Sequence, residues 1–510
     1  MNGAESLLAT AAAGGVDLCL ANPGTTEMPL VAALDASPEI RAVLGLFEGV
    51  CTGAADGYGR MTGRPALTLL HLGPGFANGI ANLHNARRAR TPVVNLIGDH
   101  ARWHLAADAP LTSDIASLAR PVGGVRTADS APDLPKQMAE ALAEALGPPA
   151  GVVSLIVPAD CQWEEASGPL PPAPRPTLPE PEQEAVARSA EALRAGGALV
   201  LGGPSALGKA GLTSAARIRA AGVPVWVETF TARIERGTGL PDLPRIPYFP
   251  EQAREALARA RCLVLAGAPE PVAFFGYRGQ PSRLLREDQP ALQLAGPGED
   301  AAAGLAALAD RLAAPDAPLS SPARPEAGRG PLTAASLGQT LAARQPEGAI
   351  VVDEAATTGG PWTAFSAAAP PHTVLGLTGG AIGQGLPCAT GAALACPERP
   401  VIALQADGSA LYTLQALWTQ ARENLHVVSV ICANRRYRIL QVELARAGIA
   451  EPGPKARSLT SLDVPAVDWV SAARAFGVPA LRCESAEELD RALQRALASP
   501  GPSLIEAVLD

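Results

Sequence analysis

The sequence lacks three features that would point to common classes of protein. None of its eight cysteines stands in a CxxC pair, so neither a zinc ribbon nor a disulfide framework is indicated, and we expect reduced thiols in the cytoplasm. No apolar run reaches the ~18 residues that cross a membrane. The first basic residue is Arg41, so we expect no signal peptide either. Acidic residues outnumber basic ones by 50 to 41 without a long basic stripe, which disfavours nucleic acid as a partner.

What the chain does have is length and a regular alternation of segments. Its 510 residues suffice for about three domains. Two proline-rich stretches, 166–180 and 313–331, are typical of exposed linkers. They divide the chain into 1–165, 182–312 and 332–510, which we interpret as three domains.

Each segment alternates short apolar stretches with helical ones. Near-continuous apolar strands separated by helices predict parallel sheets that are covered on both faces. We therefore expect an α/β fold with three doubly wound parallel-sheet domains, and ligands at the carboxyl ends of the strands. The expected strands are 16–21, 42–47, 66–71, 93–98, 152–158, 198–202, 223–227, 262–266, 350–353, 374–377, 401–405, 427–432 and 503–508.

The strongest chemical signal lies in the third segment. Strand 401–405 is followed by Asp407, a helix is expected over 411–424, and strand 427–432 is followed by Asn434. Such a βαβ unit places Asp407 and Asn434 at the same edge of one sheet. Their oxygen atoms, with phosphate held at the helix N-terminus, make a ligand set suited to Mg²⁺. Taken alone, the motif is also compatible with an ordinary turn that has an N-capping Asp.

This stretch resembles the diphosphate-binding motif of thiamine diphosphate (ThDP) enzymes, in which GDG precedes NN. Here the two parts read ADGS at 406–409 and AN at 433–434, and the flanking text is similar to acetolactate synthases and benzoylformate decarboxylases. The resemblance implies pyrimidine-binding, central and diphosphate-binding domains, in that order. It also implies that Asp407, the Asn434 side chain and the Arg436 backbone carbonyl hold Mg²⁺ on the diphosphate. The departures Ala406 and Ala433 leave these ligand residues in place, so we expect both to be tolerated.

Glu48 is the second signal, because it is the only charged residue between Arg41 and Asp56 and stands between a predicted strand and a helix of small residues. A carboxylate in that setting needs a partner or a proton. The resemblance implies that Glu48 is the family's catalytic glutamate, which activates ThDP through N1′ of its aminopyrimidine. The alternative is a Glu satisfied by the helix dipole.

Glycines recur every four residues on the helix after Glu48, at positions 49, 53 and 57. Each costs ~1 kcal/mol of helix stability relative to Ala, which is reasonable where another backbone packs closely. In the family, the pyrimidine-binding domain of one subunit meets the diphosphate domain of another. We therefore interpret the glycines as part of a subunit contact in a homodimer or homotetramer with shared active sites, with packing inside the chain as the alternative.

A third signal follows two other predicted strands at the same sheet edge as Glu48, in NPGTTE at 22–27 and LHLGPG at 70–75. A His after the second of these strands is similar to the benzoylformate decarboxylase branch, whereas acetolactate synthases have a small hydroxyl residue there. His71 is thus a candidate proton relay and Thr25 a candidate partner for the substrate carboxylate. A structural His71 is the alternative. His100 and His104 lack a third metal ligand, so we expect a polar loop there, with a place in the lining of the substrate pocket as the alternative.

The glycine-rich stretch GGAIGQGLP at 379–387 is the fourth signal. By the resemblance, the Gly380 carbonyl accepts a hydrogen bond from the aminopyrimidine N4′, and Ile382 wedges the cofactor into a bent shape. Core packing is the alternative for Ile382. The residues that the resemblance assigns to cofactor binding are Asn78, Thr357, Gly380, Ile382, Gly408, Ser409 and Tyr437.

The sequence therefore predicts a ThDP- and Mg²⁺-dependent decarboxylase or carboligase, a lyase or transferase that acts on a 2-oxo acid. The choice of branch stays open, because 267–280 lacks the second His of benzoylformate decarboxylases, and Leu111 and Thr112 stand where acetolactate synthases have Gln. An FAD-containing ThDP oxidase and a catalytically silent ThDP-fold subunit are the alternatives. No fingerprint indicates FAD, and the presence of Glu48, Asp407 and Asn434 argues against a silent subunit.

Overall fold

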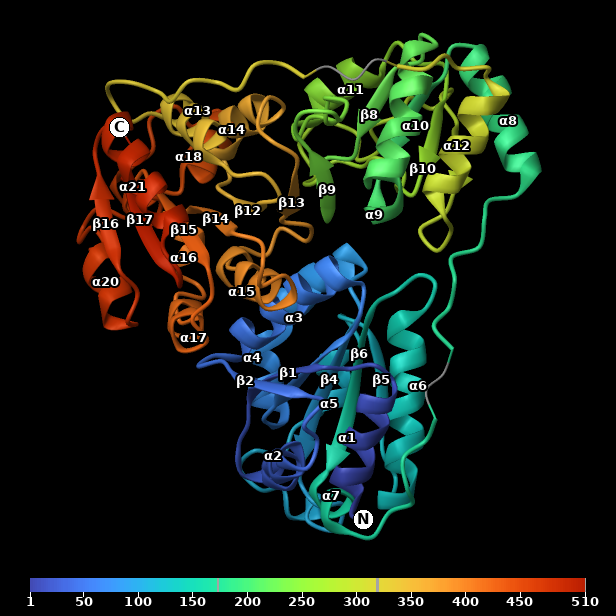
Figure 1. Ribbon diagram of the computed structural model, residues 1–510, viewed down its shortest axis with the longest axis vertical. Helices are drawn as coiled ribbons and strands as arrows, with labels where there is room; N and C mark the ends of the chain where they lie inside the picture. Colours follow the sequence, from blue (N-terminus) through green and yellow to red (C-terminus); the bar gives the residue numbers. More distant parts are fainter. Residues whose placement is uncertain (172–173, 318–320, 510) are drawn as a thin grey trace.

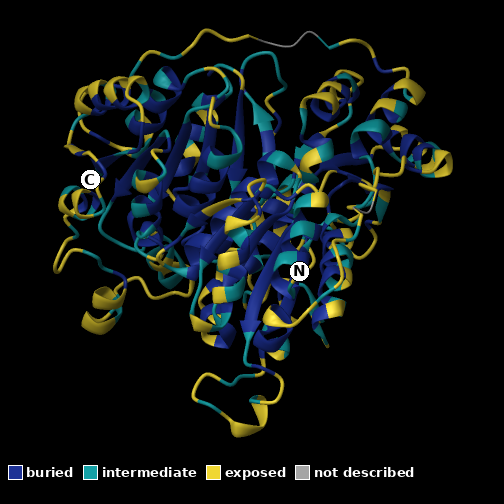
Figure 2. Cartoon of the chain, turned by 60° about the horizontal axis from the view of Figure 1, so that its bottom comes forward, coloured by how far each residue is buried: buried dark blue, intermediate teal, exposed yellow. Residues whose placement is uncertain are grey.

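The computed structural model describes residues 1–171, 174–317 and 321–509, which form three sheets along the chain (Figure 1). The predicted α/β fold with parallel sheets is confirmed. The sheets are buried beneath helices whose outer faces are exposed (Figure 2). None of the helices in the described parts of the chain combines the length and apolar character that a membrane crossing requires.

The N-terminal sheet is entirely parallel, with the order β2-β1-β3-β4-β6-β5. Its strands are β1 (Leu18–Asn22), β2 (Arg41–Leu44), β3 (Ala66–Leu70), β4 (Val93–Asp99), β5 (Gly124–Thr127) and β6 (Val152–Pro158). The helices around it are α1 (Gly3–Ala13), α2 (Met28–Asp35), α3 (Glu48–Thr62), α4 (Leu72–Ala89), α5 (Ile115–Ala119), α6 (Leu134–Leu146) and α7 (Ala159–Trp163), with 3-10 turns η1 (Thr25–Glu27), η2 (Leu105–Ala107) and η3 (Ala131–Asp133).

The central sheet is also parallel, with the order β11-β10-β7-β8. Its strands are β7 (Ala198–Leu201), β8 (Val225–Val227), β10 (Leu263–Ala266) and β11 (Ala291–Ala295). The helices in this part are α8 (Gln183–Arg194), α9 (Gly203–Ala206), α10 (Lys209–Ala220), α11 (Pro250–Leu257) and α12 (Ala301–Arg311).

The C-terminal sheet has the order β16-β17-β15-β14-β12-β13-β9. Its strands are β12 (Ile350–Glu354), β13 (His372–Gly376), β14 (Val401–Ala406), β15 (Val427–Ala433), β16 (Ala480–Cys483), β17 (Ser503–Val508) and the edge strand β9 (Arg233–Arg236). The helices are α13 (Ala334–Arg344), α14 (Gly359–Ser366), α15 (Gly385–Ala395), α16 (Asp407–Ala410), α17 (Ala416–Arg422), α18 (Arg438–Arg446), α19 (Pro454–Leu459), α20 (Trp469–Ala475) and α21 (Ala486–Ala498).

One strand departs from the expected separation of the sheets. β9 comes from the central segment of the chain but pairs antiparallel with β13 of the C-terminal sheet. It was not predicted, and neither were β5, β11 and β16, because all four are short and only partly buried and so lack a continuous apolar run. The helix expected over 411–424 is also shorter, since α17 begins only at Ala416.

The helices α3 and α15 pack against each other and join the first and last parts of the chain (Figure 1). A Cβ placed on Gly57 would lie 2.1 Å from the Cys388 carbonyl oxygen, and one on Gly391 would lie 1.8 Å from the Ala54 carbonyl oxygen. The small residues of α3 therefore pack inside the chain. Our interpretation of these glycines as a subunit contact was wrong, because a pattern of small residues shows that a backbone packs closely but not which backbone it is.

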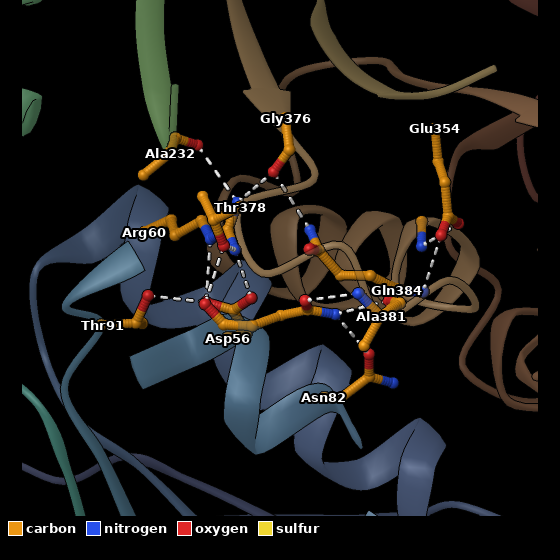
Figure 3. A network of polar contacts seen from close by, with 12 residues as sticks. Asp56, Arg60, Asn82, Thr91, Ala232, Glu354, Gly376, Thr378, Ala381 and Gln384 are labelled. Atoms are coloured by element: carbon orange, nitrogen blue, oxygen red, sulfur yellow. Dashed lines mark hydrogen bonds and ion pairs between the residues drawn. The ribbon is translucent and has the colours of Figure 1, made fainter. Parts of the chain in front are cut away.

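A buried ion pair on α3 joins all three parts of the chain (Figure 3). The Arg60 guanidinium donates to the Asp56 carboxylate at 2.8 Å and 2.5 Å. It also donates to the Ala232 carbonyl next to β9 at 3.2 Å and to the Gly376 carbonyl at the end of β13 at 2.6 Å. Thr91 donates a hydrogen bond to Asp56 at 2.6 Å, so both members of the ion pair have further hydrogen-bond partners.

We predict that Gly57→Ala destabilises the protein. The added methyl group would meet the Cys388 carbonyl oxygen, which belongs to the backbone and moves only if α3 and α15 separate. Overpacking of this kind costs about 1–3 kcal/mol, more than the gain in helix propensity of about 1 kcal/mol. Thermal unfolding should show a lower melting temperature. Gly151→Ala is the control, because nothing lies within 4 Å of its added Cβ, and equal melting temperatures for both variants would contradict the packing argument.

Candidate active site

Glu48 begins α3, directly after the loop that follows β2, and its side chain is buried. Its Oε2 accepts a hydrogen bond from Asn78 Nδ2 of α4 at 3.0 Å, which is the only hydrogen bond that the described residues give to this carboxylate. A Cβ on Gly75 would lie 3.1 Å from Oε1, so the glycine leaves room beside the carboxylate. Glu48 thus keeps most of its capacity to accept hydrogen bonds.

His71 lies at the carboxyl end of β3, beside Glu48, and pairs with a carboxylate that our sequence analysis did not assign. Its Nδ1 is 2.8 Å from Oε2 of Glu27, which is fully buried. Glu27 also accepts hydrogen bonds from the Gly24 amide at 2.7 Å and from Thr26 Oγ1 at 2.6 Å. Because an ionised carboxylate only accepts, we assign the proton to Nδ1 of His71, which leaves Nε2 free for other partners. The signal for Glu27 was present in the NPGTTE motif.

Two further predicted residues lie at the same edge of the N-terminal sheet. Thr25 is exposed at the start of η1. His100 follows β4, and its ring centroid is 5.3 Å from that of His104. Burial raises the pKa of Asp99, the last residue of β4, and the negative charge of Glu27 adds to the effect. Asp99 accepts a hydrogen bond from the His100 amide at 2.7 Å.

Asp407 and Asn434 follow β14 and β15, which are adjacent and parallel as expected. The two oxygens of Asp407 accept from the Gly408 amide at 2.8 Å and from the Arg435 amide at 2.6 Å. Asn434 Oδ1 accepts from the Arg436 amide at 3.1 Å. Asp407 is the first residue of α16 and not its N-cap, so the ordinary capping alternative does not describe it.

The chemistry of these donors fits a magnesium ion. A carboxylate, an amide oxygen and the Arg436 carbonyl oxygen are hard ligands of the type that Mg²⁺ prefers. Burial raises the pKa of Asp407, because the charged carboxylate is less stable away from water. A cation bound nearby would stabilise the charged form and offset this effect. Within the described ranges, no group of three or more His, Cys, Asp and Glu side chains could hold a metal ion.

The remaining predicted cofactor-binding residues lie in α16 and in the segments that follow β12, β13 and β15 of the C-terminal sheet. Gly408 and Ser409 are buried in α16, and the Tyr437 ring is so close to Gly408 that a Cβ there would lie 2.3 Å from it. Thr357 is exposed just before α14, and Ile382 is half-buried. Gly380 is exposed and has φ +75°, a conformation that L side chains rarely adopt.

A second unassigned carboxylate, Glu354, fastens the glycine-rich loop that contains Gly380 and Ile382. Its Oε1 accepts from the Gly383 amide at 2.7 Å and the Gln384 amide at 3.2 Å, and its Oε2 accepts from the Gly385 amide at 2.7 Å. Burial raises its pKa to about 7, although the three N–H donors oppose the shift. Glu354 ends β12, and the only sequence signal was its place directly after a predicted strand.

The two groups of candidate residues belong to different sheets of the chain. Among the residues that the structure describes, no hydrogen bond or ion pair joins Glu48, Asn78 or His71 to the glycine-rich loop or to Asp407. The loop instead contacts α4 further along, where Asn85 Nδ2 donates to the Ala381 carbonyl at 2.7 Å. Each chain therefore presents one half of the predicted site on its N-terminal sheet and the other half on its C-terminal sheet.

Comparison with known proteins identifies the family. The model of the thiamine pyrophosphate enzyme N-terminal TPP binding domain matches residues 1–118, and that of the C-terminal TPP binding domain matches residues 358–507. The chain belongs to the thiamine pyrophosphate enzyme family. Membership confirms the resemblance seen in the sequence and makes the protein a ThDP-dependent enzyme.

Several members of the thiamine pyrophosphate enzyme family match almost the whole chain. A Mycobacterium tuberculosis protein with the provisional name acetolactate synthase large subunit IlvX is 49% identical over 100% of this chain and 99% of its own length. The benzoylformate decarboxylase of Pseudomonas aeruginosa is 31% identical over 96% of each chain. The structure of the ThDP-dependent 4-hydroxybenzoylformate decarboxylase of Rhodococcus jostii RHA1 superposes with a TM-score of 0.87 at 26% identity, covering 100% of this chain and 99% of that one.

We predict that Glu354→Gln weakens ThDP binding. An amide nitrogen would face a backbone N–H of the glycine-rich loop, so at least one of the three hydrogen bonds is lost, at about 1–3 kcal/mol. In the wild-type protein, protonation below about pH 7 removes acceptor capacity from Glu354 in the same way, so ThDP affinity should fall as the pH is lowered through that value. Calorimetry from pH 6 to pH 8 should show this fall in the wild type and a low, flatter affinity in the variant.

Glu347→Gln is the matched control, because this glutamate is exposed in the loop before β12. Its ThDP affinity should match that of the wild type at every pH. Equal affinity of Glu354→Gln and the wild type at pH 8 would refute the role given to Glu354.

Proposed function

We propose that this ThDP-dependent enzyme removes CO₂ from a 2-oxo acid and either protonates the product or joins it to a second carbonyl compound. The observation that supports this best is the Glu27–His71 pair, with Nδ1 to Oε2 at 2.8 Å, at the same sheet edge as Glu48. A carboxylate that is free to accept and a neighbouring imidazole with a free Nε2 provide the two proton-handling groups that such a reaction requires.

In this proposal the cofactor is held by the C-terminal half of the site. Asp407, the Asn434 side chain and the Arg436 carbonyl would bind Mg²⁺ on the diphosphate, and Gly380 and Ile382 would position the aminopyrimidine. When bound, ThDP supplies a carbon nucleophile that can add to the substrate carbonyl and accept the electrons left when CO₂ departs. Glu48 holds a proton at the aminopyrimidine N1′, and Thr25 binds the substrate carboxylate.

His71 favours decarboxylation as the main reaction. Once its Nε2 has taken up a proton, the His71 imidazolium would donate that proton to the carbon from which CO₂ has left and return to the neutral imidazole, and the Glu27 carboxylate would stabilise the imidazolium before the transfer. The relatives named benzoylformate decarboxylase and 4-hydroxybenzoylformate decarboxylase match the chain nearly end to end, which supports an aromatic 2-oxo acid as the first substrate to test. The eight cysteines are free thiols, which supports the proposal that the enzyme works in the reducing cytoplasm.

The test is a CO₂-release screen over aromatic and aliphatic 2-oxo acids with ThDP and Mg²⁺. We expect turnover by the wild type and a loss of about 10²–10⁴-fold in His71→Ala. ThDP affinity and exchange of the cofactor C2 proton should stay nearly intact in that variant, because Glu48 is unchanged. His426→Ala is the control, because His426 directly precedes β15 and so lies at the opposite end of that strand from Asn434. Full turnover in His71→Ala would remove the reason for favouring decarboxylation.

We further propose that two copies of the chain complete each active site, in a homodimer or a homotetramer. The reason is that the Glu48 group and the Asp407 group belong to different sheets, and that no hydrogen bond or ion pair joins the two groups among the described residues. Glu48→Ala and Asp407→Ala should each be inactive alone. When the two are unfolded, mixed and refolded together, hybrid dimers should regain up to about half of the wild-type sites, and verified hybrids without activity would refute the sharing.

A further inference from the structure

A cavity of about 460 Å³ lies between the central and the C-terminal parts of the chain, and none of the residues that line it belongs to the candidate active site. It is formed by β8, β9, the segment 242–245 and α14, which Figure 1 places on the two sides of the junction. A second pocket of about 290 Å³ shares Arg219 and Pro244 with it and continues along residues 222–226. Ligands of parallel sheets usually bind where the strand order reverses, here between β10 and β7, whereas this cavity lies at the edge strand β8.

The side chains around the cavity have an excess of positive charge. Arg219, Arg236 and Arg245 line it together with a single carboxylate, Asp242. Arg236 is well satisfied, because it pairs with Asp242 at 3.0 Å and donates to the Thr363 carbonyl at 3.0 Å. Of the groups that the structure describes, only the neutral Asp242 carbonyl accepts a hydrogen bond from Arg219, at 2.7 Å. The cavity therefore contains more guanidinium groups than its own residues neutralise.

Arg245 is the least satisfied of the three. Its guanidinium forms no ion pair and donates no hydrogen bond within the described residues. The Arg245 side chain is exposed and lines the cavity. Surrounding protein lowers its pKa by desolvation, and the carboxylates of Asp353 and Glu228 attract it only from beyond ion-pair distance. Each of those carboxylates accepts a backbone N–H instead, Asp353 from Ala355 at 3.1 Å and Glu228 from Gly203 at 3.0 Å. A guanidinium keeps its charge, so a cation is held between two domains without a direct counterion.

We propose that this cavity binds a small organic anion. The oxyanion head group, a phosphate monoester or a carboxylate, is held by Arg245 and Arg219, whose planar N–H forks match such groups. An apolar body packs against Val227, Ile234 and Leu243, which form the other wall. The volume lies within the range of about 300–1,000 Å³ that small-molecule sites occupy. The site goes beyond the proposed decarboxylation and does not depend on it.

The experiment uses the protein loaded with ThDP and Mg²⁺, so that the diphosphate site is filled. Phenyl phosphate and phenylacetate are titrated by calorimetry as the anionic probes, and benzyl alcohol serves as the uncharged one. We expect saturable binding of at least one anion and none of benzyl alcohol. Arg245→Gln should weaken that binding about tenfold or more, because charged hydrogen bonds are lost.

Two further variants keep the test decisive. Arg219→Gln, at the exposed end of α10, should weaken binding as well and gives the answer if Arg245→Gln does not fold. Arg259→Gln is the control, because it removes the same charge from an exposed position of the central part. Binding of phenyl phosphate alone identifies phosphate esters as the ligand class, and binding of both anions identifies oxyanions in general. No saturable binding of either anion, or equal affinity in the Arg245, Arg219 and Arg259 variants, would overturn the proposal.

Discussion

The rest of the structure depends on the buried contact between α3 and α15, in which Asp56 and Arg60 form an ion pair with almost no access to water. A buried pair is weak evidence for stability, because desolvation offsets the attraction between the charges. Removing one partner, however, costs about 3–5 kcal/mol. The pair therefore acts mainly as a positional constraint, since Arg60 satisfies carbonyl groups of the central and C-terminal parts at the same time.

This constraint determines where the candidate residues lie. α3 begins with Glu48, and the Arg60 guanidinium three turns later holds the end of β13, from which the chain enters the glycine-rich loop. Asn82 and Asn85 of α4 bind the same loop, so its path is determined from the N-terminal side by side chains and from the C-terminal side by Glu354. The two halves of the site are thus attached to one junction, although no hydrogen bond or ion pair joins them directly among the described residues.

Much of the fold and of the candidate site could be predicted from the sequence. The parts that were not predictable have one physical reason in common. The long buried strands β4, β6, β14 and β15 were predictable because burial on both faces makes their sequences continuously apolar. Asp407 and Asn434 followed from those strands, since residues after parallel strands share an edge. β9 was not predictable, because an edge strand that crosses to another sheet depends on a distant partner. The interpretation of the α3 glycines as a subunit contact was wrong for the same reason, because the partner of a small-residue helix is also distant in the sequence.

Three buried carboxylates illustrate the same limit and also show how it can be overcome. In the sequence, Glu48 and Glu354 each follow a predicted strand directly and Glu27 lies in the segment after another, so the three look alike. In the structure they differ in what they accept: Glu354 receives three backbone N–H groups, Glu27 receives one N–H, one hydroxyl and an imidazole, and Glu48 receives a single amide. Glu354 and Glu27 each receive three donors, which hold the glycine-rich loop and the imidazole, whereas Glu48 receives one and is available to a ligand. The count of donors, which depends on tertiary contacts, therefore separates the glutamate that we propose as reactive from its two supports.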